Sequence, residues 1–386
     1  MPRLPLVNMP HFPTHLPGTS LRYKPGFIHG GPGIEHDCGT SRGVGYYLEP
    51  LALLALFGRR PLSASLRGVT NGGPDPGVDV FRAVTLPLLR QLAGLEDGLE
   101  LRIEARGAPP LGGGEVRLRL PCVKALPPVA LTDEGMVRRV RGVAHSMRVS
   151  PQAANRLVDG ARGVMNKALT QSLRHSWASR GGLVVCRRPA RVSPPTEAHS
   201  ILPFTAQLLA DVFIFTDHMS GRASGLSPGY GVALVAETTS GRMLCAEACA
   251  ELGKASQSTA EDVGRAAAAA LLEEVSRGGV ADSMHQALVL TLCALGPEEI
   301  NEVRLGPLTP YAGALRNRNG RGPGARRQAH PTLGLPFPPF TRAVGTLRHL
   351  RDFFNVQFSI RPEEETRTIF LSCVGAGVKN LSKKIA

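Results

Sequence analysis

Residues 106–116 read Arg-Gly-Ala-Pro-Pro-Leu-Gly-Gly-Gly-Glu-Val. Three consecutive glycines behind a proline turn let backbone N–H groups approach an anion without a Cβ in the way. The arginine adds a guanidinium fork that matches phosphate or carboxylate. On the residues alone, an anion-binding turn and a plain tight turn between two strands are equally good interpretations. The candidate residues of this turn are Arg106, Gly107, Pro110, Gly112, Gly113 and Gly114.

The sequence around this turn alternates between helical and strand periodicity. Apolar spacing predicts helices at 45–57 and 78–92 and strands at 62–66, 99–105 and 115–120. The same order of helix, strand, helix, strand and strand recurs within 259–374, which predicts an internal repeat in an α+β fold. The elements expected there are a helix opened by a Ser258–Glu261 capping box, a helix at 283–295, a strand at 303–305, a helix at 347–354, and strands at 356–360 and 368–373.

A different module separates the two repeats. Ser150-Pro151 is a good helix start, because serine caps a helix and proline fits its first position. This helix is expected to end near Leu169. Strands are expected to follow at 212–215, 231–237 and 243–248.

Composition excludes several classes of protein. The chain has 386 residues, enough for two or three domains, and its 42% hydrophobic content is too high for a wholly disordered chain. No run of about 18 apolar residues is present, so we expect no membrane-spanning segment. Seven scattered cysteines are typical of reduced thiols in an intracellular protein. With 5% aromatic residues, a broad aromatic platform for single-stranded RNA is disfavoured.

The net charge of +14 comes mostly from two stretches rich in Gly, Pro and Ser. Residues 170–208 hold five arginines and one glutamate, and residues 313–343 hold six arginines and no acid. Clustered arginines can bind RNA phosphates, so a pair of RNA-binding loops is one interpretation. Because loops this long are uncommon inside domains, we interpret both stretches as disordered insertions.

Several segments together resemble a known family. The turn at 106–116 is similar to the signature of the RNA 3′-terminal phosphate cyclase family. Further segments resemble the non-cyclising branch of that family, which acts in ribosome assembly. These segments are Ile34–Cys38, Arg42–Glu49, Leu66–Asn71, Arg141–Ser150, Phe215–Met219, Ala236–Gly241 and Cys373–Ser382.

The resemblance implies repeated βαβαββ units, similar to EPSP synthase, with a smaller inserted α/β domain. We expect the repeat domain at 18–136 and 251–386, the inserted domain at 137–250, and a non-matching segment at 1–17. Because the similarity begins within a unit, we expect the first unit to be truncated and to lack part of its sheet. Such a unit would expose a sheet edge.

The resemblance also implies what the chain does not do. Cyclases of this family carry AMP on a histidine, and imidazole suits this role because its neutral nitrogen attacks phosphorus near neutral pH. The matching position here is Arg342, or Tyr311 if the second insertion is excised. His285-Gln286 stands where cyclases carry Asp-Gln. We therefore expect no cyclase activity, no cofactor and no metal site.

The function implied by the resemblance is non-catalytic. The chain is expected in the nucleolus of the nucleus, within the small-subunit processome, where it serves early pre-rRNA processing toward 18S rRNA and the 40S subunit. Its expected partners are pre-rRNA, processome proteins and a nucleolar ribosome-assembly GTPase that it activates. The alternative is a pre-rRNA endonuclease that uses Arg348, His349 and Arg351 on a charged helix. Arg42 and Arg67, which adjoin glycine-containing turns, are possible anion contacts.

Overall fold

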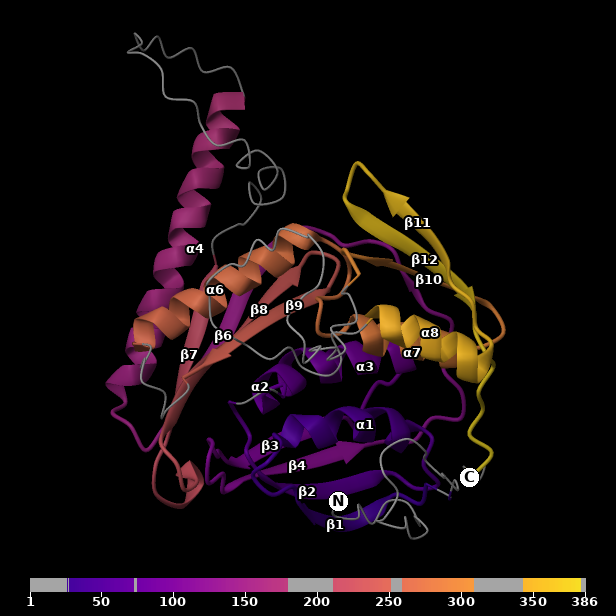
Figure 1. Cartoon of the computed structure of the whole chain (residues 1–386), viewed down its shortest axis with the longest axis horizontal. Helices are drawn as coiled ribbons and strands as arrows, with labels where there is room; N and C mark the ends of the chain where they lie inside the picture. The colour runs from indigo at the N-terminus through magenta and orange to yellow at the C-terminus, as the bar shows by residue number, and fades with distance from the viewer. Residues whose placement is uncertain are drawn as a thin grey trace, which may run out of the picture.

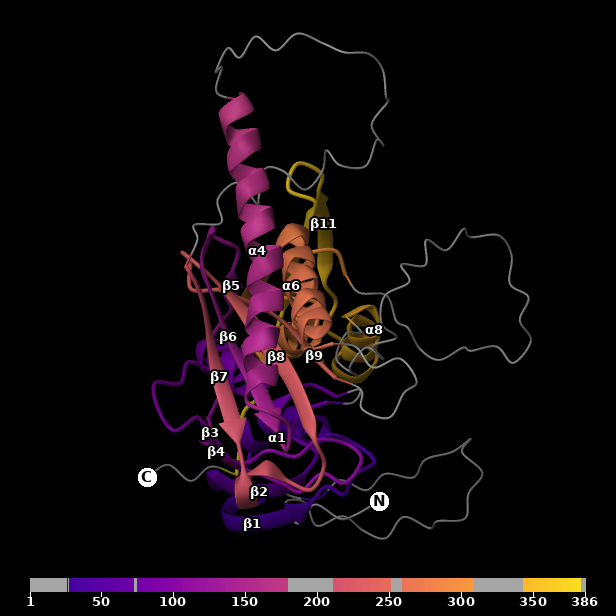
Figure 2. The same cartoon turned by 90° about the vertical axis from the view of Figure 1, so that its left-hand side faces the viewer.

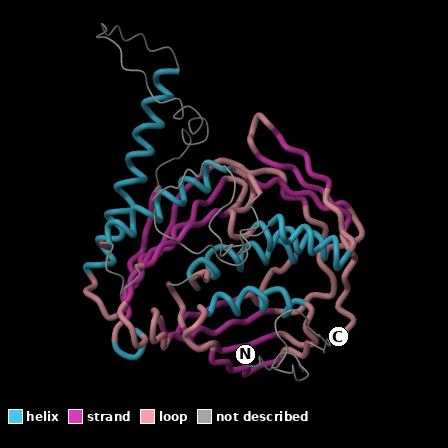
Figure 3. Tube along the Cα trace, viewed as in Figure 1, coloured by secondary structure: helices cyan, strands magenta, loops and turns pink. Residues whose placement is uncertain are grey.

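The computed structural model describes residues 26, 28–72, 75–179, 211–250, 259–308 and 343–382. Three four-stranded sheets organise these residues, and helices lie between and against them (Figures 1 and 3). Two of the sheets belong to a repeated unit, and the third belongs to a module inserted in the chain of the second unit. None of the helices in these described ranges is long and apolar enough to cross a membrane.

The first unit has the complete order βαβαββ. Its elements are β1 (Gly31–Asp37), α1 (Val44–Leu56), β2 (Leu62–Gly68), the continuous helix of α2 (Val78–Val80), η1 (Phe81–Thr85) and α3 (Leu86–Ala93), then β3 (Glu100–Ala105) and β4 (Gly114–Leu120). Strand order in the sheet is β1-β2-β4-β3. The sequence pattern predicted every element except β1. Strand β1 pairs in parallel with β2 at the edge of this sheet. The expected truncation concerns residues before 26, which lie outside the described residues, and stays a prediction.

The second unit repeats this topology. Its elements are β5 (Ala130–Leu131), α7 (Gln286–Leu295), β10 (Ile300–Leu305), α8 (Ala343–Phe354), β11 (Ser359–Glu363) and β12 (Thr368–Val374). The sheet order, read from β5, is β5-β10-β12-β11, which matches the first sheet strand for strand. The internal repeat is thus confirmed. One strand prediction was displaced: Val356 is buried between α8 and β11 rather than within a strand.

The inserted module lies between β5 and α7. It contains β6 (Val137–Met147), α4 (Gln152–Ser179), β7 (Val212–Met219), the short η2 (Gly221–Ser224), β8 (Gly229–Thr238), β9 (Met243–Cys249) and α6 (Ala260–Arg277), with strand order β7-β6-β8-β9. Helices α4 and α6 pack on one face of this sheet (Figures 1 and 2). The predicted end of the module at residue 250 is therefore too early, because α6 shares the module's hydrophobic core.

Close contact between α4 and α6 depends on glycine. A Cβ at Gly160 would lie 2.3 Å from the carbonyl oxygen of Glu261, and one at Gly264 would lie 2.1 Å from that of Leu157. The predicted ends of these two helices were wrong. Thr259 and Asp262, not Ser258 and Glu261, form the capping box of α6. Helix α4 continues to Ser179, so residues 170–179 of the first basic stretch are helical; residues 180–208 lie outside the described residues.

One core joins the two repeated units. Helices α1 and α3 from the first unit and α7 and α8 from the second lie between the two sheets (Figure 1). Their apolar residues belong to a single buried cluster with the inner faces of both sheets, including Leu48, Leu89, Leu118, Leu290 and Leu371. The inserted module has its own core and meets the first unit at a polar seam, which contains the signature arginine.

Candidate functional site

The signature turn is packed against other backbone on both sides. Gly107 accepts a hydrogen bond from the Thr70 amide, and its own amide donates to the Thr70 hydroxyl at 2.9 Å. A Cβ at Gly107 would lie 2.4 Å from the Gly114 nitrogen. Gly112 and Gly113 have φ values of 65° and 82°, which a residue with a Cβ rarely adopts. Close packing and backbone conformation therefore explain three of these glycines.

The turn also touches the inserted module. The carbonyl of Gly112 accepts a hydrogen bond from the Leu226 amide at 3.0 Å, and the Leu111 amide donates to the Ser227 hydroxyl at 3.0 Å. Pro110 follows Pro109 in a cis peptide bond within this turn. The turn thus forms a joint between the first unit and the module.

Arg106 is the centre of a buried interdomain ion network. Its side chain has no exposed surface, and its Nη1 and Nη2 donate to the two carboxylate oxygens of Asp79 at 2.6 and 2.8 Å. Nε and Nη2 donate to Asp217 of β7 at 3.0 and 2.8 Å. Nη1 also reaches the amide oxygen of Asn71 at 2.9 Å. Of the two groups that the Arg106 fork was predicted to match, phosphate and carboxylate, it meets carboxylates of the protein itself.

Burial and charge shift the titration of this network. Burial alone would raise the pKa of Asp79, but the charge and hydrogen bonds of Arg106 outweigh it and hold that pKa well below its usual range. His145 on β6 lies 3.7 Å from Asp79. Burial, reinforced by the Arg106 charge, lowers the pKa of His145 to about 4. The imidazole is therefore neutral near pH 7, and its buried Nδ1 has no hydrogen-bond partner among the residues that the structure describes.

A second polar contact joins the first unit to the inserted module. Glu247 of β9 is half-buried and accepts a hydrogen bond from the Gly77 amide at the start of α2, at 2.8 Å. Burial raises the pKa of Glu247 to about 7. Glu247, Asp79 and His145 were not predicted as site residues. Glu247 and Asp79 stand in ordinary strand and helix segments, and His145 lies in the family segment 141–150, which predicted no role for its histidine.

Three metal-ligand types of side chain meet near the start of α7. Cys245, Asp282 and His285 are buried, and their ligand atoms lie within 4.8 Å of one another. Each is already hydrogen-bonded: Asp282 accepts from the Cys245 thiol at 3.2 Å and lies 2.8 Å from Nδ1 of His285. The other ring nitrogen of His285 lies 2.9 Å from the hydroxyl of Thr85. The cluster can act as a complete hydrogen-bond network that fixes the start of α7.

The other two arginines considered for anion contact are paired with carboxylates. Arg42 donates to both carboxylate oxygens of Asp75, and its guanidinium lies 4.0 Å from the ring centroid of Tyr46. Arg67 is exposed and lies 3.2 Å from Glu115. An external anion would have to displace these partners.

The charged helix α8 presents a separate surface. Arg348, His349 and Arg351 are exposed, and Arg351 donates to Asp352 at 3.1 Å. The ring of His349 lies 6.4 Å from that of Phe353. The structure does not bring these residues together with the signature turn. Tyr311 and Arg342, the two positions that match the cyclase nucleophile, fall outside the described residues, as do residues 1–17.

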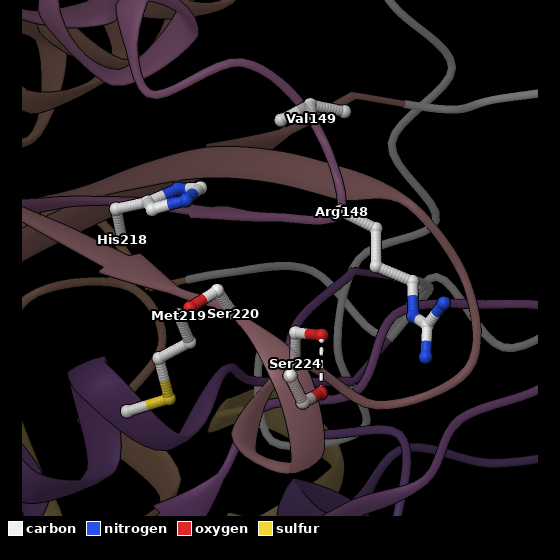
Figure 4. A pocket seen from close by; sticks show the side chains of 7 residues that line it. Arg148, Val149, His218, Met219, Ser220 and Ser224 are labelled. Atoms are coloured by element: carbon white, nitrogen blue, oxygen red, sulfur yellow. Dashed lines mark hydrogen bonds between the residues drawn. The ribbon is translucent and has the colours of Figure 1, made fainter.

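A pocket of about 200 Å³ opens beside the carboxyl ends of β6 and β7. Figure 4 shows its side chains, with Arg148 and His218 on different sides and the Ser224 hydroxyl bonded to the Gly221 carbonyl. Arg148 donates to the carbonyl of Gly225 at 2.7 Å, and His218 lies 2.9 Å from the Ser146 hydroxyl. No residue predicted from the sequence as part of a site lines this pocket.

Sequence comparison agrees with the duplicated βαβαββ topology. The profile of the RNA 3′-terminal phosphate cyclase family matches residues 12–317. The chain belongs to this family. It is 40% identical over 375 residues to the RNA 3′-terminal phosphate cyclase-like protein of Mus musculus, covering 95% of this chain and 81% of that protein. The Homo sapiens protein of the same name gives the same identity and coverage.

A third relative carries a more specific name. The chain is 37% identical over 369 residues to a protein of Schizosaccharomyces pombe named rRNA processing protein rcl1. That match covers 95% of this chain and 81% of the relative. The cyclase family fold expected from the motifs is therefore confirmed.

Proposed function

We propose that this protein is a non-catalytic component of pre-rRNA processing, required for maturation of 18S rRNA in the small-subunit processome. The observation that carries the proposal is its identity of 37% to the rRNA processing protein of S. pombe over 95% of this chain. Similarity spread over almost the whole chain means that most surfaces of the fold have a counterpart in that relative.

The hydrogen bonds of Arg106 within the protein support a non-catalytic role. A cyclase site needs donors that are free to hold the phosphates of a nucleotide. The guanidinium of Arg106 instead donates hydrogen bonds to Asp79, Asp217 and Asn71. The resemblance to the cyclases also implies that arginine or tyrosine, at 342 or 311, stands at the position of the cyclase histidine. The fold is kept while its ancestral chemistry is dropped.

The proposed role is binding in the nucleolus of the nucleus. We propose that the chain contacts pre-rRNA and processome proteins, and binds and activates a nucleolar ribosome-assembly GTPase. A rigid body suits such a scaffold, because preformed surfaces lose little conformational freedom on binding. A core shared by the two units and a buried ion network at the seam of the module support such preformed surfaces.

Replacement in cells tests this proposal. After depletion of the endogenous protein, expression of the full chain should restore processing of 18S precursors, measured by northern blotting. Affinity purification of the tagged chain should recover a nucleolar GTPase. Persistent accumulation of 18S precursors despite normal levels of the chain would contradict the proposal.

A pre-rRNA endonuclease is the alternative, favoured by one observation: Arg348, His349 and Arg351 all lie exposed on α8. Two arginines three residues apart on a helix can hold one phosphate while a histidine transfers a proton. Purified protein would then cut a precursor-rRNA fragment, and Arg348→Ala with Arg351→Ala would abolish the cut. Intact RNA after incubation with the unaltered chain excludes this activity.

A further inference from the structure

Half of one sheet face in the inserted module is open to solvent. Helices α4 and α6 cover the opposite face, where Ile214 of β7 joins the core. On the open face, Val80 and Val84 of the first unit cover only the part formed by β8 and β9, where they pack against Val235. The start of β6 and β7, around Arg141 and Phe213, stays exposed within the described portion of the chain, and β7 forms the edge of the sheet (Figure 1). Further along the same face, His145 and Asp217 meet Asp79 and Arg106 of the first unit.

Two phenylalanines stand side by side on this open half. Phe213 and Phe215 are two residues apart on β7, so their side chains point to the same face. They are 50% and 55% exposed, and their rings meet edge to face at 4.4 Å between centroids. Large aromatic side chains are usually buried, and an exposed pair on a flat strand is a common sign of a binding surface.

Arginines flank the aromatic pair on the neighbouring strand. Arg141 lies directly opposite Phe213 in the parallel register, and Arg139 follows on the same face of β6. Both arginines bond to Glu237, whose side chain is only 10% exposed, whereas the arginine side chains are 40% and 49% exposed. The carboxylate lies behind the two guanidiniums, so the charge presented to solvent is positive.

We propose that the open half of this sheet, formed by Phe213, Phe215, Arg139 and Arg141, binds single-stranded RNA. Each ring offers a face on which one base stacks, and the guanidiniums contact the adjoining phosphates. The proposal rests on the proposed function, since it supplies the contact by which the chain holds an unpaired stretch of pre-rRNA. It names a narrow site for about two bases, which is compatible with an aromatic content of only 5%.

The charge of the patch favours RNA over a protein segment. A protein that docks on two phenylalanines needs apolar side chains around them, and Val143, opposite Phe215, is a partly buried aliphatic neighbour on β6. Arg139 and Arg141 add two guanidiniums, which match phosphates. The one carboxylate of β7 on this face, Asp217, is neutralised by Arg106. A duplex cannot use the site, because its bases are stacked on one another and their faces are not available.

The test measures binding of the full purified chain to a labelled oligouridylate of about ten nucleotides, by fluorescence anisotropy at raised salt. Raised salt suppresses nonspecific binding by basic segments, while stacking persists. The double variant Phe213→Ala, Phe215→Ala should weaken binding at least about fivefold, the lower end of what one base stack contributes. The matched control is Phe353→Ala with Phe354→Ala on α8, two phenylalanines that are 80% and 44% exposed; this variant should bind like the unaltered chain.

Two further variants separate stacking from plain apolar contact. Phe213→Tyr with Phe215→Tyr keeps the ring faces and should retain RNA affinity, whereas Phe213→Leu with Phe215→Leu should lose it. Equal RNA affinity for the alanine variant and the unaltered chain overturns the proposal. RNA affinity that is equal for the leucine and tyrosine variants also overturns it, because plain apolar contact would then replace base stacking.

Failure of this site is distinguishable from failure of the proposed function. If the alanine variant binds RNA normally but the unaltered chain restores 18S precursor processing, only the proposed RNA site is refuted. If the chain fails to restore processing, the proposed function is refuted, whatever affinity for oligouridylate is measured. Because both phenylalanines are exposed, the alanine variant should unfold at the same temperature as the unaltered chain, which thermal denaturation checks.

Discussion

Arg106 donates to both carboxylate oxygens of Asp79, at 2.6 and 2.8 Å, and both side chains are buried. The pair joins the end of β3 to helix α2, and Asp217 extends it to the inserted module. A residue of the signature turn therefore holds two parts of the protein together.

Loss of the Arg106 side chain should strongly destabilise the protein. Arg106→Met leaves the Asp79 carboxylate buried without its partner, which costs about 3–5 kcal/mol in the free energy of unfolding. Urea unfolding measures the change. The control Arg67→Met removes an exposed arginine and should change stability by less than about 1 kcal/mol. Equal effects of the two substitutions would show that the buried network contributes nothing.

Acid should weaken the seam through His145. Its pKa is lowered by burial from 6.5 to about 4 in the folded state, so the unfolded chain takes up the proton first as the pH falls. Stability from this group is therefore complete above pH 6.5 and is lost between about pH 6.5 and 4.

The variant His145→Gln isolates this contribution. Relative to the unaltered protein, the variant should gain about 3 kcal/mol as the pH falls through that window, measured by urea unfolding at each pH. A stability difference between the two proteins that does not vary with pH would contradict a buried neutral imidazole.

Glu247 should act in the opposite direction. Burial raises its pKa from 4.5 to about 7, so stability from this group is complete below pH 4.5 and is lost as the pH rises to about 7. Glu247→Gln keeps the acceptor for the Gly77 amide and removes the titration. The variant should gain about 3 kcal/mol relative to the unaltered protein between pH 4.5 and 7. If instead the variant loses stability in that range, the carboxylate is ionised and stabilising.

Two glycines of α4 form a matched pair for the helix contact. Gly160→Ala places a Cβ 2.3 Å from a carbonyl oxygen of α6 and should cost about 1–3 kcal/mol, because the helices must separate. Gly163→Ala, on the same helix, meets nothing within 4 Å and should stabilise by about 0.5–1 kcal/mol. Thermal unfolding of both variants measures the difference. Similar melting temperatures would show that α4 and α6 do not approach this closely.

Periodicity was enough to find most of the elements, because their apolar faces are buried in one shared core. It missed β1, whose sequence Gly-Pro-Gly-Ile-Glu-His-Asp offers a single large aliphatic residue. Its strand conformation comes from pairing with β2, a partner that no local pattern reveals. Likewise, α6 belongs to the module because it packs closely on α4 through glycines, and α4 is far from α6 along the chain. No local pattern in α6 reveals this contact.

The candidate site was less predictable than the fold. The motif identified Arg106, but its role is decided by Asp79 and Asp217, which the fold brings to it from a helix and from another domain. Phe213 and Phe215 were predicted to lie in a strand, and Phe215 also in the family segment 215–219, but neither was predicted to be exposed. Alternation could not show this exposure, because β7 is an edge strand and its first half lies beyond the part of the sheet that the first unit covers.

The most direct test of the central claim, that this family member works by contact and not by nucleotide transfer, is incubation of the purified chain with ATP labelled on its α-phosphate. After denaturing electrophoresis, the account predicts no label on the protein band, while a cyclase of the same family treated in parallel retains it. Label held on this chain through an acid-labile bond to histidine would contradict the account.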